Sequence, residues 1–307
     1  MIQTHPETAT ELASAVWIDL ISPTPDEVAR VHDVTGLRAP AEHEVSEIET
    51  SSRLAYAAGA YTVSAPLLTR AEDGSAVLTP VGFVLDARRL VTVRFAPIPT
   101  FDEAIKVCNA HAAPTAEEAF LHLFELIVDK SADGLEQGGA DCEAISRGAF
   151  ADRKVDSSAL RATLRQIGIV SDQLSQVRDS LLGVGRIAAF MTQEGLEGAP
   201  SINAPRMHAI HGDVVSLTDY QAHLSNKLQF LLDATLGFIN IEQNEIVKTL
   251  TIASIVGIPP VLVAGIYGMN FRAMPELSWP LGYPLAIVLM ILTGVAPLLW
   301  FRRRGWM

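Results

Sequence analysis

Cysteine and basic residues are scarce in this chain. Cys108 and Cys142 are the two cysteines among 307 residues, and they show no Cys-x-x-Cys spacing. This argues against a disulfide framework and against a cysteine zinc site. Lysine and arginine number 23 against 35 acidic residues, a net charge of -12. Because phosphate contacts need cationic side chains, we expect no nucleic-acid partner.

Sequence signals for catalysis are also missing. The chain has no His-Glu-x-x-His pair, no phosphate-binding glycine loop and no nucleophile elbow. We therefore expect no enzyme activity and no resident cofactor. The first 15 residues are polar and contain no apolar run, so we expect no secretory signal peptide and a soluble part that stays in the cytoplasm.

The apolar residues are concentrated near the C-terminus. Residues 249–271 and 279–301 are two uncharged runs of 23 residues each, longer than the roughly 20 residues needed to cross a bilayer. Lys248 precedes the first run and Arg302, Arg303 and Arg304 follow the second. By the positive-inside rule both ends lie in the cytoplasm, and the short connection at 272–278 lies outside.

The first half of the chain has mixed α/β character. The turn signals Ser22-Pro23 and Gly36 bracket one helix, and period-two alternation indicates strands. The expected strands cover 15–20, 53–68 with a break near Gly59, 77–85 and 90–95, and the expected helices cover 24–36, 101–110 and 115–130. We predict a cytoplasmic α/β domain over residues 1–150.

Residues 151–248 are predicted to form a helical stalk. Apolar side chains recur there every three or four residues, which marks one helix face. A breaker at 195–205 allows a chain reversal, and the next helix meets no strong breaker until Pro259-Pro260. If that helix continues into the membrane it is about 90 Å long. A helix of that length favours packing against copies of the same chain.

A specific motif lies where the first apolar run ends. Gly265-Ile266-Tyr267-Gly268-Met269-Asn270-Phe271 is followed by Met274-Pro275-Glu276-Leu277. This arrangement resembles the CorA family of magnesium channels, whose signature is Gly-Met-Asn at the outer end of the first span. The resemblance is strong over residues 240–307 and extends before that in architecture only.

The resemblance implies an overall architecture. It predicts an α+β fold with an N-terminal cytoplasmic α/β domain, a long helical stalk and two C-terminal transmembrane helices, assembled as a homopentameric funnel in contact with membrane lipid. Residues 249–271 would be the pore-lining helix, 272–278 the external loop, 279–301 the second transmembrane helix and 302–307 a basic cytoplasmic tail. The location implied is a bacterial-type inner membrane.

The chemistry of the motif suits a hydrated cation. Mg²⁺ gives up its water shell reluctantly, so a selective mouth should accept hydrogen bonds from the bound waters. Asn270 offers an amide oxygen, and Gly268 lets a backbone carbonyl approach without a side chain in the way. The resemblance assigns ion selection at the mouth to Gly268, Met269, Asn270 and Glu276.

The resemblance also assigns a pore and a regulatory site. The residues that it places on or near the pore are Asp233, Asn244, Val247, Leu250, Ile258, Val261 and Gly265. The family often has Thr where this chain has Val261. Carboxylates that could hold regulatory cytosolic Mg²⁺ between subunits are Asp213 and Asp219 on the stalk, and Glu42, Glu44, Glu47 and Glu49 on the first domain.

Several other interpretations stay open at this point. The same fold serves zinc (ZntB-like) and cobalt or nickel transporters, although the Met-Pro-Glu-Leu loop favours the magnesium branch. A different class is a non-conducting, membrane-anchored sensor. Two further groups of side chains have metal-binding spacing, but a matching second helix is not evident. They are Glu118, His122, Glu125 and Asp129, and His208 with His211.

Overall fold

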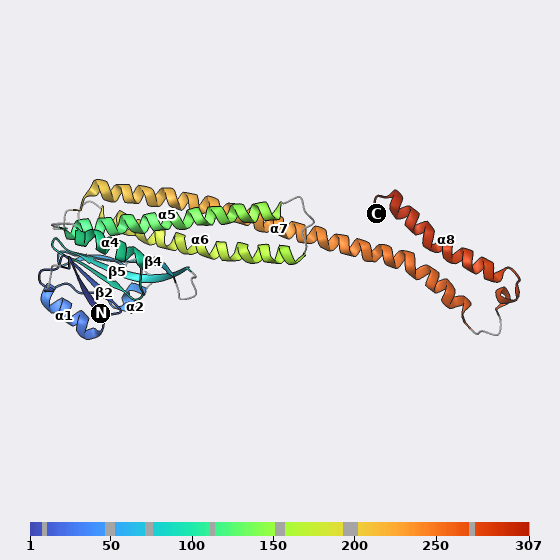
Figure 1. Cartoon of the computed structure of the whole chain (residues 1–307), viewed down its shortest axis with the longest axis horizontal. Coiled ribbons are helices and arrows are strands. Elements are labelled where there is room, and N and C mark those ends of the chain that lie inside the picture. The colour runs from blue at the N-terminus through green and yellow to red at the C-terminus, as the bar shows by residue number, and fades with distance from the viewer. Residues whose placement is uncertain are drawn as a thin grey trace. The chain divides into compact units, whose positions relative to one another are not determined.

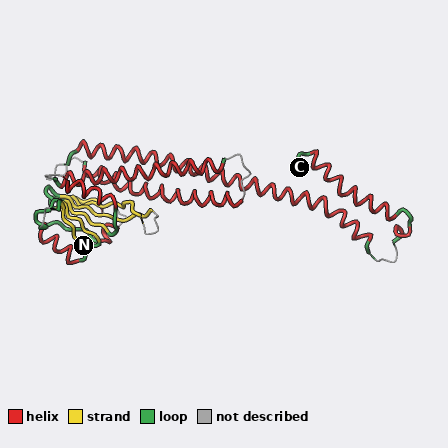
Figure 2. Tube along the Cα trace, viewed as in Figure 1, coloured by secondary structure: helices red, strands yellow, loops and turns green. Residues whose placement is uncertain are grey.

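The computed structural model describes residues 1–7, 11–46, 53–70, 76–110, 114–150, 157–192, 202–269 and 274–306 (Figures 1 and 2). The contacts divide the chain into two units. The first unit comprises Met1–Arg153 and Ala162–Leu232, and the second comprises Lys154–Arg161 and Asp233–Met307. The predicted boundaries at residues 150 and 248 stay predictions.

A six-stranded sheet with the order β1-β2-β6-β5-β4-β3 lies in the first unit. Its neighbours pair antiparallel, except that β2 and β6 are parallel. Positive φ angles at Ala58 and Gly59, 53° and 80°, turn the chain between the third and fourth strands. The strands are β1 (Ile2–His5), β2 (Trp17–Ile21), β3 (Leu54–Ala57), β4 (Ala60–Arg70), β5 (Ala76–Leu85) and β6 (Leu90–Arg94).

Local capping signals define the first helix, α1 (Pro25–Thr35). The Thr24 hydroxyl accepts a hydrogen bond from the Glu27 N–H, and the Glu27 carboxylate accepts one from the Thr24 N–H. Gly36 ends the helix with a φ of 73°, a left-handed conformation that glycine adopts without strain. Two further helices accompany the sheet, α2 (Glu42–Ser46) and α4 (Pro99–Ala110).

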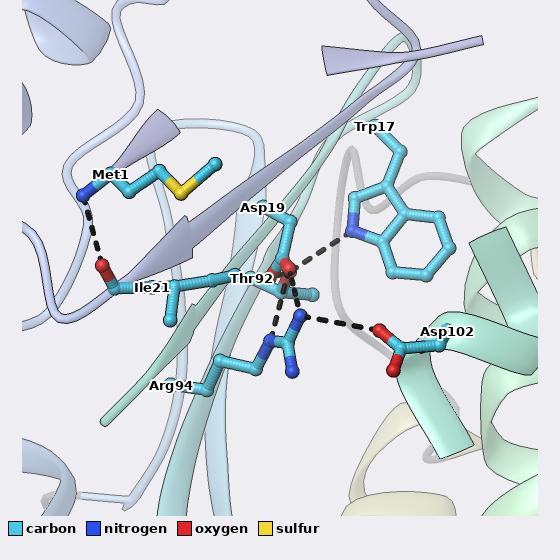
Figure 3. Close-up of polar contacts among 7 residues, drawn as sticks. All are labelled: Met1, Trp17, Asp19, Ile21, Thr92, Arg94 and Asp102. Carbon is cyan, nitrogen blue, oxygen red and sulfur yellow. Dashed lines mark hydrogen bonds and ion pairs between the residues drawn. The ribbon is translucent and has the colours of Figure 1, made fainter. Parts of the chain in front are cut away.

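A buried polar network joins the parallel strands β2 and β6 (Figure 3). Arg94 donates from Nε and Nη2 to Oδ2 of Asp19, at 3.0 and 2.8 Å. The Thr92 hydroxyl donates to Oδ1 of Asp19 at 2.6 Å and accepts from the indole N–H of Trp17 at 3.0 Å. The side chains of Asp19 and Arg94 are 0% and 3% exposed. Burying these charges is tolerated because each one is paired and hydrogen-bonded.

Three long helices lie along one another beside the sheet in the first unit (Figure 1). They are α5 (Ala116–Ala149), α6 (Ser157–Met191) from Ala162 onward, and the first part of α7 (Ala204–Tyr267). Phe83 of the sheet and Phe120 and Phe124 of α5 share one hydrophobic core with side chains of α6 and α7. A Cβ on Gly183 would lie 2.9 Å from Ala65 Cβ, so this glycine allows α6 to approach β4 closely.

The second unit contains the rest of α7, a 3₁₀ turn η1 (Pro275–Ser278) and α8 (Gly282–Arg303). Helix α7 is unbroken over 64 residues, although Pro259 and Pro260 lie inside it. Proline removes a backbone N–H, so Pro260 leaves the Val256 carbonyl without its usual helical donor. A Cβ on Gly294 of α8 would lie 3.7 Å from this oxygen and 3.4 Å from Pro260 Cγ. The glycine therefore lets α8 pack directly on this part of α7.

The fold class predicted from the sequence is confirmed, with a mixed sheet followed by long helices and two apolar C-terminal helices. Strand β1 and helix α2 were not predicted, and α5 extends well beyond the predicted end at residue 130. The capping box at Thr115 and Glu118 starts α5, and the glycines at 134, 138 and 139 do not stop it. Their open sides pack against other helices instead, such as Leu174 against Gly138.

Candidate pore and ion-binding residues

The predicted signature begins where α7 ends. Gly268 donates its N–H to the Ala264 carbonyl at 2.9 Å, and Met269 donates to Ile266 at 3.2 Å, which closes the last turn. A Cβ on Gly268 would lie only 3.0 Å from the Ala264 oxygen, so a larger residue would strain this turn. Asn270 lies outside the described residues, and Glu276 is described only as part of the η1 backbone.

The predicted pore residues of α7 lie on one exposed face. Val247, Leu250, Ile258 and Val261 are 60%, 66%, 62% and 71% exposed, and Asn244 is also exposed. An added Cβ on Gly265 would meet no atom within 4 Å. A contiguous set of exposed apolar side chains marks a surface that contacts a membrane, another protein surface or a ligand path.

Helix α8 covers the opposite face of α7. Val256 and Pro260 meet Gly294 there, and Ile252, Val263 and Tyr267 follow at helical spacing on the same side, all partly buried. Val247 and Val256 are nine residues apart, which places them about 180° apart around a helix of 3.6 residues per turn. The predicted pore face is therefore the face of α7 that α8 leaves uncovered.

A shallow apolar hollow of about 600 Å³ lies along this uncovered face. The residues that line it include the glycines Gly257 and Gly265 and the large apolar residues Ile258, Val261 and Met269. The hollow offers room for a side chain, a lipid chain or an ion path, depending on what lies opposite. Within the described part of the chain, the residues that line it are all apolar or glycine.

Comparison with known proteins identifies the family. The sequence matches the family described as "CorA-like Mg2+ transporter protein" over residues 13–303. The chain belongs to this CorA-like family. It is 35% identical over 308 residues to the magnesium transport protein CorA of Salmonella typhimurium, covering 98% of this chain and 95% of that protein. It is 34% identical over 299 residues to the CorA of Yersinia pseudotuberculosis, covering 97% and 93%.

The fold of this CorA-like chain is also that of a solved CorA structure. The complete CorA magnesium transporter from Methanocaldococcus jannaschii superposes with a TM-score of 0.74 at 21% identity, covering 95% of this chain and 91% of that one. Both α7 and α8 are long and apolar enough to cross a membrane. Their most apolar windows are 0% and 11% buried, unlike those of core helices in a soluble protein.

Three acidic residues of the predicted ion path and regulatory site belong to α7. Asp213, Asp219 and Asp233 are exposed on α7. Among the residues that the structure describes, no three His, Cys, Asp or Glu side chains gather to hold a metal. A regulatory site at Asp213 or Asp219 stays a prediction.

Three other carboxylates that the sequence suggests as metal ligands, those of Glu118, Glu125 and Glu44, are hydrogen-bonded to protein groups. The Glu118 carboxylate accepts a hydrogen bond from the Thr115 N–H at the start of α5. Arg206 donates to both carboxylate oxygens of Glu125 at 2.8 Å. Glu44 accepts hydrogen bonds from the Ala41 N–H and from Arg38. The Ala41 donor, followed by Arg38, holds the pKa of the Glu44 carboxyl below its usual range. Glu47 and Glu49 lie outside the described residues.

Sequence reasoning missed two features near the candidate pore. The first is Gly294, which allows α8 to approach α7, and the second is an aromatic contact of Lys248. The Lys248 ammonium lies 5.8 Å from the ring centroid of Trp306. Lys248 follows Val247 directly, so a charge next to the predicted constriction is in contact with the segment that follows α8. The signal available in the sequence was a basic residue, Lys248, just before the first apolar run and a tryptophan, Trp306, shortly after the second.

Proposed function

We propose that this chain forms a homopentameric channel that admits Mg²⁺ across the inner membrane, with both termini in the cytoplasm. The observation that carries the proposal is the exposed apolar face of α7, which leads directly to Gly268-Met269-Asn270. Membership of the CorA-like transporter family and relatives named magnesium transport proteins support it. A transporter of this kind needs no catalytic residues, and we propose none.

Copies of the chain would complete the pore. Because α8 already covers the opposite side of α7, the uncovered face is the one available to surround an axis. The count of five rests on resemblance to the family. Lipid would then contact the outer surface of α8, whose exposed apolar side chains include Val288, Leu292 and Leu299.

Each predicted residue has a physical role in this channel. Amide oxygens of Asn270 and backbone carbonyls near Gly268 would accept hydrogen bonds from the waters of the ion, with Met269 and Glu276 beside them. Val247, Leu250 and Ile258 would form an apolar constriction that closes by excluding water. The remaining predicted pore residues, in order from the cytoplasm, are Asp233, Asn244, Val261 and Gly265.

The membrane potential would supply the driving force. A divalent ion gains about 4.6 kcal/mol on moving through an inside-negative potential of about 100 mV, twice the value for one charge. No coupled reaction is required for uptake down this gradient. Cytosolic cation would favour the closed arrangement if it binds that arrangement more tightly.

Flux through the purified full-length chain in liposomes tests the proposal. With an inside-negative potential, Mg²⁺ uptake should be robust in the unmodified protein and absent in Asn270→Ala. Asn109→Ala removes a surface amide that contacts Glu7, and it should leave uptake unchanged. Zn²⁺ uptake without Mg²⁺ uptake would contradict the choice of ion, and no flux of any divalent cation would favour a non-conducting sensor.

We propose that Asp213 and Asp219 contribute to inhibition by cytosolic Mg²⁺ through sites completed by neighbouring copies. Both carboxylates are exposed on α7, where a partner could reach them. The double variant Asp213→Asn/Asp219→Asn should conduct at internal Mg²⁺ concentrations that shut the unmodified channel. Asp172→Asn, which removes a carboxylate of α6 that contacts Gln176, is the matched control. Equal inhibition in both variants would exclude these two residues.

A further inference from the structure

The end of α8 folds back on itself. The backbone N–H of Trp306 donates to the Phe301 carbonyl at 3.1 Å, and the backbone N–H of Gly305 donates to the Arg302 carbonyl at 3.2 Å. Gly305 has a φ of 69°, so this is a left-handed helix cap of the Schellman type. The indole of Trp306 consequently stacks on Phe301, with ring centroids 5.4 Å apart and an interplanar angle of 28°. Phe301 is 2% exposed, so the motif gives Trp306 a defined position.

This position brings Trp306 to Lys248 of α7. The Lys248 ammonium is 5.8 Å from the ring centroid, within the range of a cation–π interaction. No carboxylate among the described residues lies within 4.0 Å of this ammonium. The ring is therefore the contact that orients the charge in the described part of the chain.

Lys248 lies at a sensitive place on the helix. It is the next residue after Val247, about 100° further around α7, between the uncovered face and the face that packs on α8. A lysine side chain is a point charge on a flexible stem of four carbons. Without an anchor the ammonium can reach either side, and on the Val247 side it would repel a passing divalent cation.

We propose that Trp306 is a positioning residue for conduction, which holds the Lys248 ammonium beside α8 and away from the Val247 face. The inference rests on the proposed function, because only a pore on that face makes the position of this charge matter. Repeated in each copy, the contact would keep a set of positive charges off the inner end of the ion path. Neither residue touches the ion.

Removing the charge distinguishes this role from a general role in holding α8 in place. In full-length protein in liposomes, Trp306→Ala should lower the initial rate of Mg²⁺ uptake about two- to five-fold, the population shift that an exposed cation–π contact can supply. Trp306→Ala/Lys248→Gln should restore the rate, because the neutral side chain no longer repels the ion. Gly305→Val disfavours the left-handed cap and should reproduce the loss of Trp306→Ala.

The matched control is Trp300→Ala. Trp300 is an exposed tryptophan within α8, and its ring centroid lies 5.0 Å from the guanidinium carbon of Arg304. Its removal should leave uptake unchanged. A wild-type rate in Trp306→Ala, or a loss that Lys248→Gln does not restore, would overturn the proposal.

A second readout separates this inference from the proposed function. Labelling of Lys248 by an amine-reactive ester, measured by mass spectrometry on the same proteoliposomes, should rise in Trp306→Ala and not in Trp300→Ala. Unchanged labelling would overturn the positioning role even if the channel conducts. If labelling rises while the unmodified protein carries no divalent cation, the contact is real but the proposed channel, and with it the role in conduction, is refuted.

Discussion

The buried ion pair between Asp19 and Arg94 allows a prediction with a worked magnitude. Arg94→Met keeps most of the side-chain volume but removes two hydrogen bonds to Asp19, at 3.0 and 2.8 Å. Asp19 is completely buried and would retain one donor, the Thr92 hydroxyl. Leaving one buried charge without its partner costs about 3–5 kcal/mol. The guanidinium contact with Phe101, at 4.9 Å to the ring centroid, would also be lost.

Hydrogen exchange on the full-length protein measures this cost locally. The opening free energy of β2 and β6 amides, such as those of Ile18 and Val91, should fall by about the same 3–5 kcal/mol. Asp19→Val/Arg94→Met removes both charges and should recover much of the stability, since an apolar pair of similar volume can replace a buried ion pair.

A surface ion pair of the same unit is the matched control. Arg38 and Glu44 lie 2.6 Å apart, but their side chains are 75% and 28% exposed. Arg38→Met should therefore change the opening free energy by less than about 1 kcal/mol. If Arg94→Met cost no more than Arg38→Met, the conclusion that the buried network holds β2 on β6 would be refuted.

Two further predictions concern β1 and the contact between α7 and α8. Burial lowers the pKa of His5, so the folded state favours the neutral ring. The stability of β1 should therefore be full above about pH 6.5 and fall as the pH drops below that value. In hydrogen exchange, His5→Phe should flatten this pH dependence. In Gly294→Ala the new Cβ would lie 3.4 Å from Pro260 Cγ, an ordinary van der Waals distance, so Mg²⁺ uptake should stay near normal. In Gly294→Val the larger side chain would overpack the contact between α7 and α8, destabilise it by about 1–3 kcal/mol and reduce uptake. A pH-independent β1, or equal uptake in both Gly294 variants, would contradict the respective argument.

Features encoded by neighbouring residues could be predicted from the sequence. Helix α1 was predictable because Thr24, Glu27 and Gly36 supply both of its ends locally. The two apolar helices were predictable from length and composition alone. The motif at Gly268-Met269-Asn270 identified the family before any contact was known.

Features that depend on distant contacts could not be predicted. Strand β1 has little apolar patterning of its own, and it forms because it pairs with β2, for example His5 with Trp17. Asp19 and Arg94 are 75 residues apart in the chain, so their pairing leaves no local signal. Periodicity alone also cannot tell a face exposed to lipid from one that lines a pore, and the contact of Gly294 with α7 was needed to show which face is covered.

Chemical modification of the uncovered face tests the central claim most directly. Val261→Cys and Val263→Cys place a thiol at nearly the same depth, two residues and about 200° apart on α7. Val261 is 71% exposed, whereas Val263 is partly buried on the side of α8. Burial raises the pKa of the Cys108 and Cys142 thiols, so the native cysteines should react poorly and give little background.

The measurement is Mg²⁺ uptake before and after treatment with a charged, membrane-impermeant thiol reagent from the outside. The account predicts a strong loss of uptake in Val261→Cys and no change in Val263→Cys. Equal sensitivity of the two variants, or a loss in Val263→Cys alone, would show that the uncovered face of α7 does not line the ion path.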